Sequence, residues 1–323
     1  MQTDIVDKAL GWLAQGKSVA LLSVIATWGS SPNPVGSQMC VNETGDFTGS
    51  VSAGCIEGEA VADALKAIRS GKFKINDYIV TKAMAENSGL ACGGKMTVLI
   101  QPLHDSELLT SLTAEKNQAL ITDLKTGQTR LVDEMDGNVS PEIKTAITSR
   151  QSQRFSPEGR DCFIAVYASP IKLMIIGAVH IAQSLAPLAK QFGFEVTLID
   201  PRQNFASPER FPDCHVINDW PDRALKNVNL NASMAVVTLA HDPRLDDPAL
   251  TAAINAGCFY IAALGSQRTH GKRLSRLQDQ GFSNPQLARI HGPAGLDIGA
   301  VGADEIALSI LAQLVARKNQ KEI

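Results

Sequence analysis

The stretch Leu173-Met174-Ile175-Ile176-Gly177-Ala178-Val179-His180-Ile181-Ala182-Gln183 decides the fold of the second half of the chain. An apolar run, a glycine turn and a helical segment form the phosphate-binding turn of a Rossmann βαβ unit. The next apolar run ends at Asp200, about 20 residues on, where an acidic residue commonly binds a ribose hydroxyl. We therefore expect Gly177, His180 and Asp200 to hold a phosphate or a nucleotide. Val179 replaces the second glycine of the G-x-G-x-x-G fingerprint, so the pattern fits a working nucleotide site and a repurposed one equally well.

Short apolar runs alternate with helical or loop segments throughout this half of the chain. They lie at 171–176, 195–199, 215–218, 234–239 and 259–264. Buried parallel strands produce this alternation, so we predict a doubly wound parallel sheet over residues 169–323. Polar residues follow several of these runs, at the sheet edge where such folds bind ligands, and the candidates are His241, Ser266, His291 and Asp297. We interpret His270 and Arg273, in the same region, as ordinary loop and capping residues.

The first half has a different texture and predicts an α+β domain over residues 1–168. An amphipathic helix is expected at about 3–15 and a β-rich run at 18–27, followed by a hairpin within 37–52. A helix from about residue 56 ends at Gly71, and strand-like runs follow at 73–81, 95–102 and 162–168.

One candidate thiol lies in Ser50-Val51-Ser52-Ala53-Gly54-Cys55-Ile56-Glu57-Gly58-Glu59. Cys55 falls in the first turn of the expected helix, where unpaired N–H groups and the helix dipole favour the thiolate. Ser52 and Gly54 supply the approach to it, and Glu57 is placed to orient or protonate a ligand. The alternative is a small cysteine packed beneath a tight turn.

A second candidate thiol lies in Gly89-Leu90-Ala91-Cys92-Gly93-Gly94-Lys95. Gly93 and Gly94 allow successive N–H groups to form an anion-binding concavity, and Lys95 adds positive charge beside the thiol. Thiolates suit soft metals and sulfur transfer. We hypothesise that Cys55 and Cys92 share one site, although a buried cysteine in a turn is the alternative here as well.

Composition limits the classes of function. The chain has 323 residues, 44% hydrophobic and 20% charged, with a net charge of −3, so we expect two globular domains and no nucleic-acid partner. No apolar stretch reaches the roughly 18 residues of a membrane span, and no signal peptide is expected. Six cysteines without a C-x-x-C pair favour reduced thiols in the cytoplasm.

Taken in order, these segments resemble the xanthine dehydrogenase accessory proteins of the XdhC/CoxI type. The resemblance rests on Gly29-Ser30-Ser31-Pro32 with Pro34 and Gly36, on the two cysteine segments, on 176–182, on His241-Asp242-Pro243, on Leu264-Gly265-Ser266 and on 289–299. It covers essentially the whole chain, and it departs from the family pattern at Ala53 and Val179, where glycines are usual.

The resemblance implies an accessory domain followed by a Rossmann-like domain. It also implies a maturation factor without turnover of its own, which binds molybdenum cofactor, as molybdopterin or its dinucleotide form. Such a protein protects the cofactor, assists its sulfuration and inserts it into an apo molybdenum hydroxylase of the xanthine dehydrogenase type, with a cysteine desulfurase as second partner. Cys55 and Cys92 would then lie near the molybdenum or carry the sulfur, while the turn at Gly177–His180, with Asp200, would hold the phosphate or nucleotide.

Two other hypotheses remain open. The Rossmann unit and Asp200 are compatible with an NAD(P)-dependent oxidoreductase, although Val179 and the lack of an obvious proton-relay residue disfavour it. A scaffold that docks a hydroxylase without binding cofactor is the other. The sequence is also compatible with a homodimer.

Overall fold

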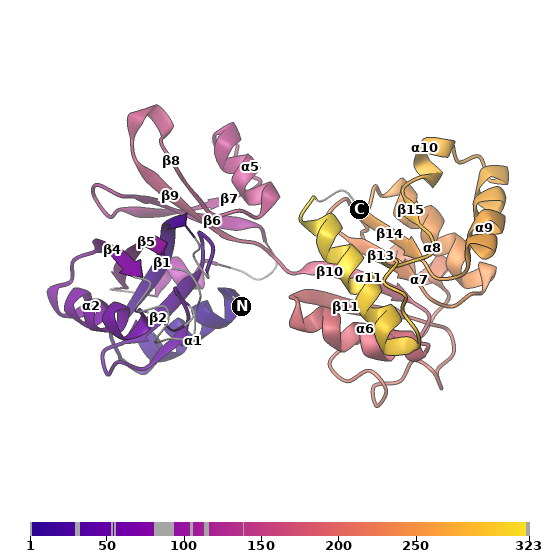
Figure 1. The fold of residues 1–323 in the computed structure, drawn as a ribbon, viewed down its shortest axis with the longest axis horizontal. Coiled ribbons are helices and arrows are strands. Elements are labelled where there is room, and N and C mark those ends of the chain that lie inside the picture. Colours follow the sequence, from indigo (N-terminus) through magenta and orange to yellow (C-terminus); the bar gives the residue numbers. More distant parts are fainter. Residues whose placement is uncertain are drawn as a thin grey trace. The chain divides into compact units, whose positions relative to one another are not determined.

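A computed structural model describes residues 2–29, 33–52, 54, 56–80, 94–103, 106–112, 116–137 and 139–320. The chain divides into two compact units, Met1–Ser169 and Pro170–Ile323 (Figure 1). Each unit has its own sheets and its own core, and each is described by itself.

The first unit contains a five-stranded antiparallel sheet in the order β3-β2-β1-β5-β4. Its strands are β1 (Val19–Gly29), β2 (Gln38–Asn42), β3 (Phe47–Gly49), β4 (Lys74–Val80) and β5 (Gly94–Leu103). The central strand β1 is apolar on both faces because both are covered. Ala20, Leu22 and Val24 pack with helix α2 (Glu57–Ser70), and Val19, Leu21 and other residues pack with helix α1 (Gln2–Ala14).

A second antiparallel sheet in this unit has the order β7-β6-β9-β8. Its strands are β6 (Gln118–Asp123), β7 (Thr129–Asp133), β8 (Gln153–Phe155) and β9 (Cys162–Tyr167). Helix α5 (Pro141–Ser149) covers one face, and the short elements α4 (Glu107–Thr110) and η1 (Pro157–Gly159) lie in the connections. The other face shares a core with α1 and β1, and the Nε2 of Gln38 donates to the hydroxyl of Tyr167 at 2.8 Å between the two sheets.

The second unit is a six-stranded parallel sheet in the order β12-β11-β10-β13-β14-β15. Its strands are β10 (Ile171–Ile176), β11 (Phe194–Ile199), β12 (His215–Ile217), β13 (Ala235–Thr238), β14 (Tyr260–Ala263) and β15 (Ile290–His291). The order reverses between β10 and β13, as in dinucleotide-binding folds. The predicted doubly wound sheet is confirmed, and the five predicted strands are joined by β15, which is too short to show an apolar run.

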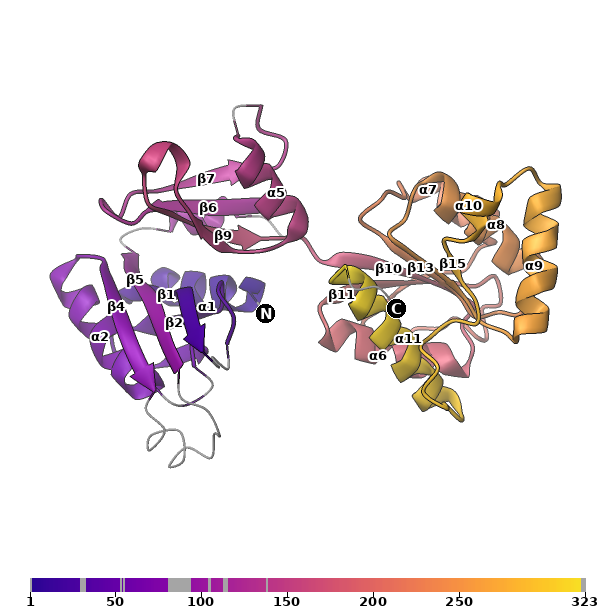
Figure 2. The same ribbon diagram turned by 45° about the horizontal axis from the view of Figure 1, so that its top comes forward.

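Helices cover both faces of this sheet (Figures 1 and 2). Helices α6 (His180–Gln191) and α11 (Ala303–Lys318) pack on one face, where alanines and leucines of α6 meet Ile310, Leu311 and Leu314. Helices α7 (Pro221–Asn227), α8 (Pro243–Asn255), α9 (Gln267–Asp279) and α10 (Asn284–Leu287) pack on the other. Ligands of such folds bind outside the carboxyl ends of the strands at the switch point, here the loops that follow β10 and β13.

Candidate functional site

The turn after β10 is shaped by Gly177. Its φ of 103° lies in the left-handed region, and a Cβ at this position would lie 2.8 Å from the backbone nitrogen of Ala240. Its own N–H donates to the carbonyl of Ile199 at 3.0 Å. Only glycine therefore fits where the loops after β10 and β13 meet, and His180, the exposed first residue of α6, follows directly.

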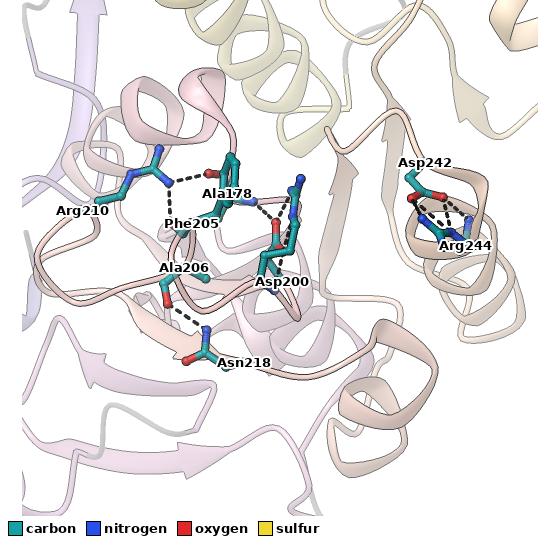
Figure 3. Close-up of polar contacts among 9 residues, drawn as sticks. Ala178, Asp200, Phe205, Ala206, Arg210, Asn218, Asp242 and Arg244 are labelled. Atoms are coloured by element: carbon teal, nitrogen blue, oxygen red, sulfur yellow. Dashed lines mark hydrogen bonds and ion pairs between the residues drawn. The ribbon is translucent and has the colours of Figure 1, made fainter.

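Asp200 lies beneath this turn and is fully buried. Its carboxylate accepts the N–H of Ala178 at 2.8 Å, the N–H of Arg202 at 2.9 Å, and the Arg202 guanidinium at 2.8 and 2.6 Å (Figure 3). Burial alone would raise the pKa of Asp200, but the bonds from Arg202 and Ala178 outweigh burial and lower it. The acid predicted to bind a ribose or phosphate therefore ties the glycine turn to β11 with both of its oxygens.

Arginines project around the same turn, and the sequence analysis did not select them. The Arg202 side chain is 42% exposed, and its guanidinium lies 4.4 Å from the ring centroid of Phe205. Arg210 lies 5.5 Å from the same ring and donates to the carbonyls of Phe205 and Ala178 (Figure 3). The available signal was Arg202 two residues after the strand-ending acid, where an arginine can accommodate a phosphate.

The loop after β13 carries His241 in a left-handed conformation, with φ of 58°. This conformation costs a non-glycine residue about 1–2 kcal/mol. Its imidazole is partly desolvated, which lowers its pKa, and the charge of Arg273 lowers the pKa further. Asp242 follows as the N-cap of α8 and accepts the N–H of Arg244 at 2.9 Å (Figure 3). The exposed His241 thus follows β13, and Gly177 and His180 follow its sheet neighbour β10.

The remaining predicted residues lie after β14 and β15. The Ser266 hydroxyl caps α9 by accepting the N–H of Thr269 at 3.2 Å, and Asp297 is exposed. The His291 ring stacks on Tyr260 with centroids 5.3 Å apart, and burial lowers its pKa. The structure therefore places His291 in packing on the α11 side of the sheet, away from the neighbouring ends of β10 and β13.

Arg273, interpreted from sequence as an ordinary loop residue, is only 2% exposed. Its guanidinium donates to the carbonyl of Leu264 at 2.8 Å and lies 3.5 Å from the carboxylate of Asp246. Burial raises the pKa of Asp246 to about 6, although the charge of Arg273 opposes this. The loop after β14 is thus held from below by a buried cation, and that interpretation of Arg273 was wrong.

In the first unit, Glu57 organises the loop that precedes α2. Its Oε1 accepts the hydroxyl of Ser50 at 2.7 Å and the N–H of Ser52 at 2.9 Å. Its Oε2 accepts the hydroxyl of Ser52 at 2.5 Å and the N–H groups of Gly54 and Ile56 at 2.8 and 3.3 Å. We call this arrangement the Glu57 knot.

The Glu57 knot fixes the ionisation of its own carboxylate. Burial by itself would raise the pKa of Glu57, but the bonds from Ser52 and Ser50 outweigh it and bring the pKa to about 2. The group is therefore ionised at neutral pH and holds the loop in place. Such a carboxylate is not a proton donor, so of the two roles considered from sequence only orientation agrees with its geometry.

Cys55, Cys92 and Gly93 lie outside the described residues. Gly94 is the first residue of β5 and pairs with Gly29 and Val80. The cysteines that the structure does describe are all free, and burial raises the pKa of each: Cys40, Cys162, Cys214 and Cys258. None of these four is a favoured thiolate.

The described ranges show neither a metal centre nor a membrane span. Their residues include no group of three or more His, Cys, Asp or Glu side chains that could hold a metal ion. Within the same ranges, every helix is too short or too polar to cross a membrane.

Comparison with known proteins places the chain in a family. Residues 173–314 match the model of the XdhC Rossmann domain, and residues 12–79 match that of the XdhC and CoxI family, so the two models together cover well over half of the chain. The chain belongs to the XdhC and CoxI family. The resemblance seen in the sequence is thereby confirmed.

Similar proteins match over nearly the full length of this family member. It is 28% identical to the molybdenum cofactor insertion chaperone PaoD of Escherichia coli K12 over 316 residues, which is 96% of this chain and 87% of PaoD. It is 23% identical to a Bacillus subtilis 168 protein named as a probable xanthine dehydrogenase component, covering 95% of this chain and 96% of that one. A crystal structure of a Bacillus halodurans protein described as a xanthine dehydrogenase is 22% identical with a TM-score of 0.78, covering 98% and 96% of the two chains. This last likeness confirms the fold class.

Proposed function

We propose that this XdhC/CoxI protein is a molybdenum cofactor chaperone. It binds the cofactor, protects it, assists exchange of an oxo for a sulfido ligand, and inserts the cofactor into a xanthine dehydrogenase-type hydroxylase. The single observation that carries the proposal is the similarity to the insertion chaperone PaoD across 96% of the chain, which includes both units. The cofactor is cargo for such a protein, so a site that releases it serves better than a closed metal cage.

The thiol role falls on Cys55 and Cys92. The four described cysteines have raised pKa values, so they do not supply the thiolate that molybdenum or sulfur transfer requires. The Glu57 knot binds both neighbours of Cys55, Gly54 and Ile56, through their backbone N–H groups. Glu57 is thus a positioning residue for this loop. Ser52 and Gly54 belong to its frame, as Gly93 and Gly94 would to that of Cys92.

The second unit is proposed to hold the phosphate or nucleotide end. Gly177 and His180 form the turn, and His241, Ser266 and Asp297 follow neighbouring strands along the same edge. Asp200 acts through Arg202, whose half-exposed guanidinium suits a phosphate better than a sealed carboxylate does. His291, stacked on Tyr260, supports the edge by packing.

The partners of the proposed function are an apo hydroxylase of the xanthine dehydrogenase type and a cysteine desulfurase that supplies the sulfur, both in the cytoplasm. Anaerobic purification of the chain, followed by molybdenum and pterin analysis, tests the binding step. Transfer is tested by reactivation of the apo-hydroxylase. We expect stoichiometric pterin in the wild type and reduced molybdenum in Cys55→Ala and Cys92→Ala. Unchanged loading in both variants would remove the cysteines from the site, and a chain that docks the hydroxylase without pterin would be a scaffold.

An NAD(P)-dependent oxidoreductase is the second candidate, and the strand order of the second unit favours it. The sealed carboxylate of Asp200 and the presence of Val179 in the turn oppose it, because both remove contacts that a dinucleotide normally makes. Fluorescence titration with reduced nicotinamide cofactors separates the two functions. Tight binding with turnover would replace the chaperone proposal.

A further inference from the structure

We propose that a cavity in the first unit, lined by Asn33, Gln38, Ser50 and Arg150, seats the pterin and the phosphate of the cargo. This inference rests on the proposed function and assigns a place to the pterin. It concerns residues that the sequence analysis did not select.

The cavity has a volume of about 910 Å³. Its wall is formed by the first turns of α1, the loop 33–37 with the start of β2, the end of β3 with Ser50, and the turn 150–152 between α5 and β8. Small-molecule sites typically occupy about 300–1,000 Å³. The space therefore suits a ligand of the size of molybdopterin.

Arg150 supplies the positive charge of the cavity. It is the C-cap of α5, in a left-handed conformation with φ of 57°, and it is only partly exposed. Its Nη1 donates to the carbonyl of Ser169 at 2.7 Å, which fixes the guanidinium in place. A guanidinium carries five N–H donors, so most of them remain for an anion, and a phosphate monoester matches their fork geometry.

Gln38 supplies an unsatisfied acceptor in the cavity wall. Its residue is 3% exposed, and its Nε2 donates to the Ser23 hydroxyl at 3.0 Å and to the Tyr167 hydroxyl at 2.8 Å. Its buried Oε1 has no hydrogen-bond partner among the described residues. Buried polar atoms are rarely left without a partner, and a pterin offers the amino and amide N–H groups that would satisfy this oxygen.

The cavity is joined to the loop that carries Cys55. Asn33 donates through its Nδ2 to the carbonyl and hydroxyl of Ser50, at 3.0 and 3.1 Å. The Ser50 hydroxyl in turn donates to Glu57 at 2.7 Å, so the wall of the cavity continues into the Glu57 knot. A pterin held here would place its metal-bearing end within reach of the proposed thiol.

A second cavity of the same unit offers an internal control. It measures about 600 Å³ and lies on the α5 side of the second sheet, where Arg130 and Arg160 line it. It also presents arginines, but its wall consists of residues 121–162 and is not built from the Glu57 knot. A general preference for positive charge would affect both cavities alike, whereas the proposed site would respond at Arg150.

The test uses the full-length chain under anaerobic conditions with molybdenum cofactor released from a purified hydroxylase. Affinity is measured from the pterin retained after desalting over a range of cofactor concentrations. We expect Gln151→Trp, which fills the exposed rim, and Arg150→Gln, which removes the charge, to weaken binding on the order of ten-fold or more. Arg150→Lys should recover part of the loss and Arg130→Gln should bind like the wild type. Thermal unfolding checks that each variant is folded.

Each other outcome overturns the inference in a distinguishable way. Wild-type binding that Arg150→Gln and Gln151→Trp leave unchanged would reject this cavity and leave the proposed function standing. Loss of binding in Arg130→Gln alone would move the pterin to the other cavity. A wild type that retains no pterin would reject the proposed function and this inference together.

Discussion

Replacement of Glu57 by Gln tests the Glu57 knot, which holds the loop around Cys55. The carboxylate accepts two hydrogen bonds at Oε1 and three at Oε2. An amide has a single oxygen, so at least two buried donors would face an NH₂ group in Glu57→Gln. The variant removes both the charge and part of the acceptor capacity.

The expected loss of stability follows from the pKa of Glu57. The hydrogen bonds bring it from the ordinary 4.5 to about 2. At 1.36 kcal/mol per pKa unit, the knot stabilises the folded first unit by about 3 kcal/mol. Because the folded-state pKa is depressed, this contribution is complete above about pH 4.5 and is lost as the pH falls toward 2. The gap between wild type and Glu57→Gln should therefore be widest at neutral pH.

Scanning calorimetry and tryptophan fluorescence measure the effect. A loss of about 3 kcal/mol lowers the Tm of a domain of this size by roughly 6–12 °C. The buried Trp12 reports on the first unit, while the transition of the second unit should be unchanged. Glu59→Gln is the matched control, because it removes the same charge from the exposed side of the same helical turn. Equal, small shifts in Glu57→Gln and Glu59→Gln, or a gap that persists at pH 2, would refute the reasoning.

Three further predictions concern the thiols and the second unit. Iodoacetamide at pH 7 should label Cys55 and Cys92 well before the four cysteines with raised pKa values, as read by peptide mass spectrometry; labelling of those four first would contradict the thiolate assignment. Asp200→Asn should lower the free energy of unfolding of the second unit by about 3 kcal/mol or more in urea titrations, since it breaks a buried charge pair, and a loss below about 1 kcal/mol would show that the pair is not needed. His241→Gly should be more stable than His241→Ala by up to about 1 kcal/mol, because glycine accepts the left-handed conformation and loses part of that gain to its unfolded-state entropy. The reverse order of stabilities for the two His241 variants would mean that the left-handed conformation is not a source of strain.

The sequence analysis predicted those elements whose signals are local. The apolar run before Gly177 and the regular recurrence of such runs predict parallel strands, because only strands buried on both faces remain apolar throughout. Gly71 was predicted to end a helix, and it is the left-handed C-cap of α2. The two-residue strand β15 was missed because it is too short to show a pattern.

Roles that depend on burial needed the tertiary structure. Asp200 and Arg202 stand two positions apart in the sequence, but only the packed turn shows that the carboxylate is sealed and the guanidinium faces outward. His291 reads as a polar strand-end residue until the ring of Tyr260 is seen to lie against it. Glu57 reads as an acid near a thiol until the donors around it set its pKa.

By itself, the sequence determined the two-part architecture, the family and the segments that carry its chemistry. All of these are encoded in periodicity and in short motifs along the chain. Only the tertiary structure decided which polar groups are already occupied, and which residues from positions 4 to 152 enclose one cavity. The physical reason is that hydrogen-bond satisfaction and desolvation depend on neighbours in space, and those neighbours are distant in sequence.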